Sequence, residues 1–314
     1  MNIKPVVLPV VLSLSLFACD SDTVEVISVS ADNSSSTNDN GTDGSTNTDN
    51  TDNGNTNDGN TDGNTNGGGN GVLSNPDRLI SQVGLVKVEA VNTDNDFSRG
   101  LFTEMDTPLS AQEVLEFFVP ESDLCEVSRY NAAFPPGGAF KIYDQEPTLI
   151  SSGSNITLTS GADVYANLER QIVEGTGLVY RSNSALDENI PDNLVLNIPG
   201  EVFPGFANVA LSNVPQLQVS APTDTVTENT EFVWNANTDP LSVFEIYAGY
   251  NSPETNQVIE IGCTVIDDGQ FSFSEATRGE LGEGFTADWF SYLRVVYDVA
   301  ESGDALLLVA NSDD

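Results

Sequence analysis

From residue 216 onward, hydrophobic and polar residues alternate along the chain. The segments TEFVWNA, QVIEIGCTVI and WFSYLRVVYDVA each repeat with a period of two, which is typical of strands that bury one face. In QVIEIGCTVI this pattern predicts that Ile259, Ile261, Cys263 and Val265 point inward, whereas Glu260 and Thr264 point outward. With QLQVSAP, LSVFEIYAGY, QFSFSE and ALLLVAN, the segment holds seven short strand candidates, a number that suits a β-sandwich.

Turn signals separate these strand candidates. Asp267-Asp268-Gly269 stands between two alternating runs, and an Asp-Gly step in that position predicts a hairpin. The stretch Glu301-Ser302-Gly303-Asp304 separates the last two candidates in the same way. The sequence therefore predicts an antiparallel arrangement for residues 216–314.

Residues 72–215 are also rich in strand patterns, but the spacing is less regular. Strand candidates are GLVKVEAVN, AFKIYD, NITLTS, DVYANLE, GLVYRS, NLVLNIP and NVALSN. One helix is expected at SAQEVLEFFV, because Ser110 followed by Glu113 forms a capping box and Pro120 ends the segment. VPQLQVSAPTDT, around Pro215, is the predicted boundary between this domain and the next.

The run FVWNANTDPLSVFEIYAGY resembles the fibronectin type III pattern, in which a Trp on one strand precedes an aromatic-bearing strand. This resemblance implies an immunoglobulin- or fibronectin III-like sandwich for residues 216–314. Domains of that family are mainly interaction and spacer modules. The expected fold class is therefore mainly β, with a C-terminal sandwich after a less regular β-rich domain and a disordered tether before both.

The N-terminus has the pattern of an export signal. Lys4 precedes the apolar run PVVLPVVLSLSLF, which is too short for the ~20 residues of a membrane-spanning helix. Leu16-Phe17-Ala18-Cys19 resembles the lipobox of bacterial lipoproteins. That resemblance implies that residues 1–18 are a signal peptide, that cleavage precedes Cys19, and that Cys19 is lipidated and anchors the protein to a membrane.

Residues 19–71 follow as the predicted tether. From Ser30 to Gly71 the chain consists almost entirely of Asn, Asp, Gly, Thr and Ser. Such a segment lacks the apolar surface that would offset the entropy of ordering, so we expect it to be disordered. The incomplete calcium-loop patterns within it lack the acidic residue that an EF-hand loop needs at its twelfth position.

The composition narrows the possible functions. The formal net charge is −38 and there is no histidine. The acidity disfavours nucleic acid as a partner. The absence of histidine excludes Ser-His-Asp catalysis and the usual histidine-bearing metal sites. An enzyme would have to use a pair of carboxylates, as glycosidases do, or a Ser-Lys arrangement, and neither Lys87 nor Lys141 lies in an S-x-x-K motif. We expect no catalytic site, no cofactor and no metal site.

Two further cysteines and several aromatic and acidic residues are candidates for special roles. Cys125 and Cys263 can form a disulfide in an oxidising compartment or remain buried thiols. Some aromatic side chains can stack on sugars or pack in the core, and some acidic residues can bind calcium or form turns. The aromatic candidates are Trp289, Phe290, Tyr292, Tyr247 and Tyr250, and the acidic ones are Asp94, Asp96, Asp267 and Asp268 with Asn95.

These patterns favour a lipoprotein of the cell envelope that displays an acidic, β-rich interaction module. Its expected location is the outer membrane or the periplasmic face of the inner membrane. Its expected partners are the membrane, through the lipid anchor, and an envelope protein or a glycan. The alternatives are a carboxylate-based hydrolase that acts on polysaccharide and a calcium-binding structural component of the envelope.

Overall fold

The computed structural model describes residues 26–30, 73–89, 98–131, 142–143, 145–173, 177–182, 190–220, 230–252, 257–282 and 285–313. For residues 26–30 only the backbone is described. Cys19 and residues 31–71, which include most of the predicted tether, lie outside this part of the chain, as do Asp94, Asn95 and Asp96.

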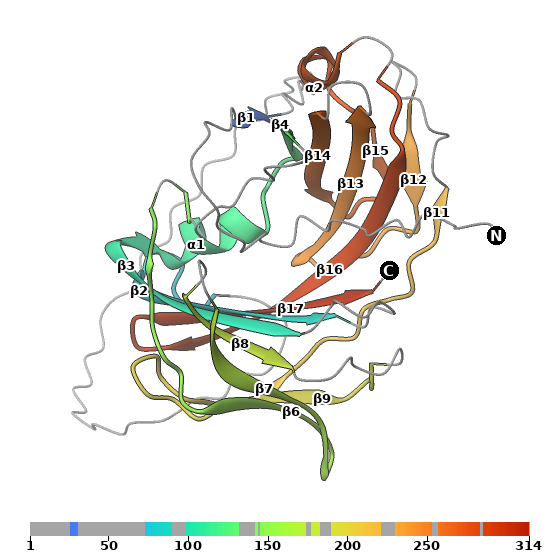
Figure 1. The fold of residues 1–314 in the computed structure, drawn as a ribbon. Coiled ribbons are helices and arrows are strands. Elements are labelled where there is room, and N and C mark those ends of the chain that lie inside the picture. The colour runs from blue at the N-terminus through green and yellow to red at the C-terminus, as the bar shows by residue number, and fades with distance from the viewer. Residues whose placement is uncertain are drawn as a thin grey trace, which may run out of the picture.

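The described chain is mainly β, with two short helices (Figure 1). The N-terminal strands are β1 (Val26–Ser30), β2 (Leu79–Glu89), β3 (Arg99–Ser110), β4 (Leu124–Asn131), β5 (Thr148–Leu149), β6 (Asn155–Ser160), β7 (Asp163–Val173), β8 (Gly177–Ser182), β9 (Leu194–Ile198) and β10 (Phe206–Ala210). The C-terminal strands are β11 (Val219–Ser220), β12 (Phe232–Trp234), β13 (Ser242–Ser252), β14 (Gln257–Ile266), β15 (Gln270–Phe271), β16 (Trp289–Ser302) and β17 (Ala305–Asp313). The helices are α1 (Ala111–Phe118) and α2 (Glu275–Leu281).

Fourteen of the strands form one mixed sheet in the order β1-β4-β14-β13-β16-β17-β2-β3-β8-β7-β6-β9-β10, with β5 paired to β3. The pair β17–β2 is parallel. A small sheet contains β11, β12 and β15. The predicted boundary between residues 215 and 216 is not a break in the large sheet, because β4 pairs with β14 and β2 pairs with β17 across it.

The small sheet covers one face of the large sheet. Phe232 of β12 and Phe271 of β15 pack into one cluster with Phe244 and Ile246 of β13. On the other face, α1 contributes Val114 and other residues to a second cluster with β2, β3, β16 and β17. Val243 at the start of β13 belongs to this second cluster, so this end of β13 is buried on both faces, which the alternating pattern alone did not predict.

The remainder of the large sheet curls around a third cluster, formed by strands β2, β3, β6 to β10 and β17. Ser212, just after β10, donates hydrogen bonds from its backbone N and Oγ to Asp298 of β16, at 2.7 and 2.6 Å. These bonds hold the last strand of the curl beside β16. In Figure 1 the curl runs from β16 and β17 through β2 to β6, β7 and β9.

Three predicted elements differ from the structure. Val26–Ser30 was expected in the tether, but it forms β1 and pairs with β4; its alternating β-branched residues favour a strand. Asp267-Asp268-Gly269 is followed by β15, which pairs with β12 rather than with β14, so the turn carries the chain from one sheet to the other. Within QFSFSE, the strand ends at Phe271 and α2 follows.

Candidate functional site: the polar face of β4, β14, β13 and β16

Four adjacent strands of the large sheet carry polar and aromatic side chains on the face that the small sheet leaves uncovered. The register aligns Tyr247 of β13 with Gly262 of β14 and Glu126 of β4. The next row aligns Gly249, Glu260 and Ser128. We call this surface the polar face; it comprises Glu126, Ser128, Tyr130, Glu245, Tyr247, Gly249, Glu260, Gly262 and Trp289.

Alternation along β13 explains why these residues share one face. Phe244, Ile246 and Ala248 lie in the cluster under the small sheet. Their neighbours Glu245 and Tyr247 must point to the opposite side of the sheet, because successive strand residues alternate. Val243 lies on that same side and packs in the cluster that includes α1, so the polar face continues the α1 side of the sheet.

Two carboxyl groups of this face have perturbed protonation. Glu260 is buried and Glu126 is half-buried. Burial raises the pKa of both groups above the ordinary value, because desolvation disfavours the charged form. The hydroxyl of Tyr130 donates a hydrogen bond to Glu260 and partly opposes the shift of the Glu260 pKa. Burial and this contact raise the pKa of Tyr130 itself.

Trp289 lies over a glycine of the neighbouring strand. Its register partner is Gly249, and a Cβ atom at position 249 would lie 2.5 Å from Cε2 and Cζ2 of the indole. Asp288 fixes the chain just before the tryptophan: its backbone N donates to Gly249 O and its Oδ2 accepts from Asn251 N, both at 2.8 Å. Glycine at this position therefore lets a large aromatic side chain lie close against the strand.

A second aromatic side chain lies near the carboxylates. The hydroxyl of Tyr247 donates a hydrogen bond to Glu245 Oε2 at 2.7 Å. Gly262 stands between Tyr247 and Glu126 in the register and adds no side chain to the row. The polar face thus combines three aromatic rings, two tyrosine hydroxyls and three carboxyl groups on the same side of four strands.

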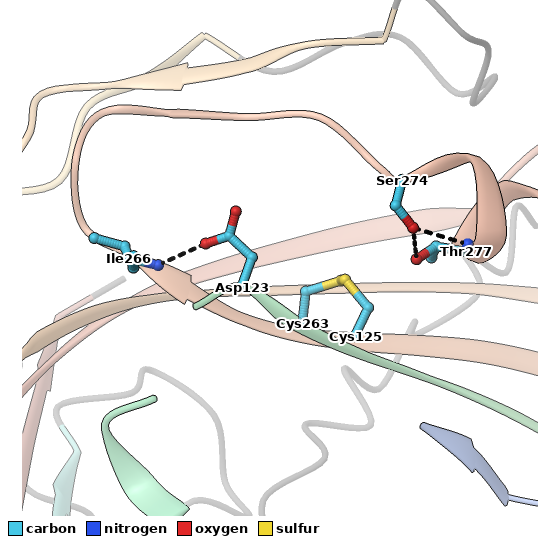
Figure 2. The surroundings of a disulfide bond; sticks show 6 residues. All are labelled: Asp123, Cys125, Cys263, Ile266, Ser274 and Thr277. Atoms are coloured by element: carbon cyan, nitrogen blue, oxygen red, sulfur yellow. Dashed lines mark hydrogen bonds between the residues drawn. A yellow bond between two sulfur atoms is a disulfide. The ribbon is translucent and has the colours of Figure 1, made fainter. Parts of the chain in front are cut away.

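A disulfide lies on the reverse side of the same strands. Cys125 and Cys263 face each other across β4 and β14, with Cα atoms 4.1 Å apart, and their sulfur atoms are bonded (Figure 2). Both residues belong to the buried cluster beneath the small sheet. The bond links positions 138 residues apart in the sequence and holds together the two strands that carry Glu126 and Glu260.

The acidic pair Asp267 and Asp268 serves the fold. Asp267 is buried and accepts hydrogen bonds from Trp234 Nε1 and Ser242 Oγ at 2.6 Å and from Arg294 Nε at 2.7 Å. Burial alone would raise its pKa, but the hydrogen bonds from Arg294, Ser242 and Trp234 lower it. Asp268 Oδ1 accepts from the backbone N of Gln270 at 3.1 Å, as a turn residue does.

The other aromatic candidates pack against the small sheet. Phe290 and Tyr292 each have ring centroids 6.0 Å from that of Phe232, and Tyr250 packs on the same cluster. Of the predicted aromatic set, Trp289 and Tyr247 are therefore the two on the polar face. Sequence analysis did not single out Glu126, Glu260 or Tyr130, because it did not predict β4 or its pairing with β14.

Within the described residues, no group of three or more acidic or cysteine side chains is placed to hold a metal ion. The helices of the described chain are too short and too polar to cross a membrane. No protein-family model, curated protein or solved structure matches this chain.

Proposed function

We propose that this protein is a lipid-anchored component of a bacterial cell envelope and that its acidic β-rich module binds a glycan at the polar face. The lipobox-like residues ending at Cys19 and the polar segment after them support the anchor and the tether. The Cys125–Cys263 disulfide fits an oxidising compartment outside the cytoplasm. The protein acts in this proposal as a binding module, at the outer membrane or on the periplasmic face of the inner membrane.

The placement of Trp289 beside the carboxyl groups carries the glycan proposal. An indole ring held against a strand offers an apolar surface on which the C–H face of a sugar can stack. The Glu126, Glu260 and Tyr130 side chains offer acceptors and donors for sugar hydroxyl groups. A neutral or weakly charged glycan suits this face better than an acidic one, because its charged groups are carboxylates.

A binding screen tests this proposal. The full-length chain, purified in detergent, is screened against envelope glycans and envelope proteins with and without calcium. Trp289→Ala should weaken binding at least about tenfold, which corresponds to ~1.4 kcal/mol. Tyr143→Ala is the matched control, because Tyr143 is an exposed aromatic residue that packs on Phe117 of α1. Binding that is unchanged by Trp289→Ala would overturn the proposal, and binding only to envelope proteins would replace the glycan with a protein partner.

The second candidate is a carboxylate-based hydrolase that acts on polysaccharide. The raised pKa values of Glu126 and Glu260, on adjacent strands of one face, favour this alternative. A carboxyl group with a raised pKa keeps its proton to higher pH and can protonate the leaving oxygen, while its partner acts as base or nucleophile.

Assays for released sugars separate the two functions. If the protein is a hydrolase, Glu126→Gln and Glu260→Gln should each abolish turnover and leave glycan binding in place. Glu231→Gln, at an exposed glutamate just before β12, should leave the rate unchanged. Binding without any turnover would support the binding module and exclude the hydrolase for the glycans tested.

The anchor has its own test. Cys19→Ser should abolish labelling by a clickable fatty acid and release the protein from membranes, because the thiol that would carry the lipid is removed. A serine variant that is still labelled and membrane-bound would contradict the lipoprotein assignment without affecting the glycan proposal.

The immunoglobulin- or fibronectin III-like relationship of residues 216–314 also remains a proposal. Its support is the packing of β12 and β15 on β13 and β14, with Trp234 and Phe244 stacked at a centroid distance of 3.9 Å. Such modules commonly serve as interaction domains, in agreement with the proposed binding role.

A further inference from the structure

Three basic residues lie side by side across β2, β3 and β8, which are strands that do not contribute to the polar face. Lys87 is the register partner of Arg99, and Arg99 is the register partner of Arg181. Directly opposite residues of antiparallel strands share one face of the sheet. We call these three residues the basic row; they bring together three of the ten lysines and arginines in a chain whose net charge is −38.

The direct opposition of Arg99 and Arg181 is unfavourable unless a negative charge joins these two residues. Like charges directly opposite each other on paired strands repel. Burial lowers the pKa of Arg181, and the positive charge of Arg99 lowers it further. The Nε atoms of Arg99 and Arg181 are shielded from solvent and have no hydrogen-bond partner, although the rest of each side chain is only half-buried.

The other arginines of the described chain have partners. Arg78 pairs with Glu301 at 3.0 Å, Arg170 with Glu201 at 3.1 Å and Arg294 with Asp267 at 2.7 Å. The remaining two donate to backbone carbonyl groups: Arg129 to Glu280 O and Arg278 to Phe273 O. Among the described residues, no carboxylate forms an ion pair with Arg99 or Arg181, despite the large excess of acids in this protein.

We propose that Arg99 and Arg181 of the basic row bind a tetrahedral oxyanion, a sulfate or phosphate group. Each guanidinium group presents several N–H donors in a planar fork, which suits the oxygen atoms of such an anion. The charge of the anion would relieve the repulsion between Arg99 and Arg181. The same chemistry is offered by a free ion and by an ester group on a glycan, and the experiment distinguishes these sources.

The main test is thermal unfolding of the full-length chain in detergent with sodium sulfate and with sodium chloride at matched ionic strength. Sulfate at millimolar concentration should raise the Tm saturably beyond the effect of chloride, because a ligand of the folded state stabilises it. Arg99→Gln and Arg181→Gln should each abolish this extra rise. Arg170→Gln should keep it, because Arg170 lies on the adjacent β7 but is paired with Glu201.

A second measurement needs no sulfate or phosphate. In chloride alone, Arg181→Gln should raise the Tm, since it removes a repelling charge, whereas Arg170→Gln should not.

To identify the source of the oxyanion, the binding of a sulfated oligosaccharide is compared with that of its desulfated form. Binding of the sulfated form that requires Arg99 and Arg181 assigns the site to a glycan ester, and stabilisation by the free ion alone assigns it to inorganic anions.

Equal stabilisation of the unsubstituted protein by sulfate and chloride would overturn the proposal. So would a sulfate effect that survives both arginine substitutions. If an arginine variant fails to fold, the comparison of sulfate with chloride in the unsubstituted protein still decides. None of these results depends on Trp289, so the oxyanion site and the glycan site at the polar face can fail separately.

Discussion

Glu260 and Asp267 are both buried carboxylates in β14 or the turn after it, yet their surroundings shift their pKa values in opposite directions. Glu260 has one tyrosine hydroxyl as a partner, and burial raises its pKa. Asp267 accepts hydrogen bonds from a guanidinium, an indole and a hydroxyl, and these lower its pKa despite burial. Glu260 therefore keeps its proton to higher pH than an exposed glutamate does, whereas Asp267 stays charged and binds the buried Arg294.

The raised pKa of Glu260 predicts a pH-dependent stability. The folded state binds more protons than the unfolded state between the unfolded pKa, about 4.3, and the raised folded pKa. The contribution of Glu260 to the free energy of unfolding is thus fully present below the unfolded pKa and is lost as the pH rises through the folded pKa.

Glu260→Gln removes this dependence and keeps an acceptor for Tyr130. Relative to the unsubstituted protein, the variant should gain more stability at about pH 8 than at about pH 4. Urea midpoints at the two pH values measure the difference, with Glu231→Gln as the exposed control. Identical pH profiles for the unsubstituted protein and the Glu260→Gln variant would contradict the assigned pKa shift.

Asp267→Asn should show the opposite behaviour. It leaves the buried Arg294 without its counter-charge, so we expect a loss of about 3–5 kcal/mol at neutral pH. The favourable contribution of Asp267 is present above its unfolded pKa and is lost as the pH falls through the lowered folded pKa. The measured loss should therefore shrink in strong acid. If Asp267→Asn leaves the free energy of unfolding at pH 7 unchanged, the Arg294–Asp267 pair does not stabilise the fold.

At the scale of elements, β4 determines the candidate site. It supplies Glu126 and Tyr130 to the polar face and Cys125 to the disulfide, although its only described neighbours in the sheet are β1 and β14. The chain approaches β4 through Asp123, whose Oδ1 accepts from the backbone N of Ile266 at 3.0 Å (Figure 2). This bond and the disulfide fix the strand at adjacent points.

Reduction of the Cys125–Cys263 bond should therefore destabilise the protein. A cross-link that closes a loop of 138 residues contributes about 4–5 kcal/mol in the chain-entropy model. The double variant Cys125→Ala/Cys263→Ala should lower the urea midpoint as much as reduction does. Intact-mass measurement of alkylated, denatured protein checks the bond itself: if Cys125 and Cys263 react before reduction, the disulfide is absent.

Local patterns predicted local elements well. The capping box at Ser110 and Glu113 forms as expected, with Glu113 N donating to Ser110 Oγ at 3.2 Å and Ser110 N donating to Glu113 Oε2 at 2.7 Å. Alternation placed Ile259, Ile261, Cys263 and Val265 inward. The last three are buried, and Ile259 is half-buried against the same cluster. These features depend on residues close in sequence, so a pattern within one segment contains the necessary information.

Long-range pairing could not be read from the sequence. Alternation assigns Glu260 to the opposite side of the strand from Cys263, which is correct. It does not predict that Glu260 is buried there. The expectation that Glu260 faces solvent was wrong, because this side chain is buried. Strands β3 and β4 were not predicted, since their polar residues interrupt the apolar pattern. The polar face joins residues from β4 and β14, and no local signal shows that these strands are adjacent.

At the scale of the whole molecule, the segments 72–215 and 216–314 share one sheet. The central strand β17 is buried on both faces: Leu306 and Leu308 pack in the cluster with α1, and Leu307 packs in the cluster of the curl. Its parallel partner β2 comes from the first segment. Apolar residues on both faces fit a central position, and they make β17 dependent on partners far away in the sequence.

The fragment 216–314 should therefore not fold alone. Without β2 and β4 it loses the neighbours of β17 and β14, as well as the partner of Cys263. We expect no cooperative urea transition and no near-ultraviolet circular dichroism signal for this fragment, whereas the full-length chain should show both. A fragment with a sharp transition and a native-like signal would support an independent C-terminal domain.

The most direct test of the polar face as a glycan site uses the fluorescence of Trp289. The protein has two tryptophans, and Trp234 is buried, with its ring stacked on Phe244. Trp234→Phe leaves Trp289 as the reporter, and Trp289→Phe provides the matched control. Titration with a glycan from the binding screen should shift the emission of Trp289 to shorter wavelength and protect it from acrylamide quenching, saturably, with no change in the control. Glycan binding that leaves the emission and quenching of Trp289 unchanged would contradict the assignment of the site to the polar face.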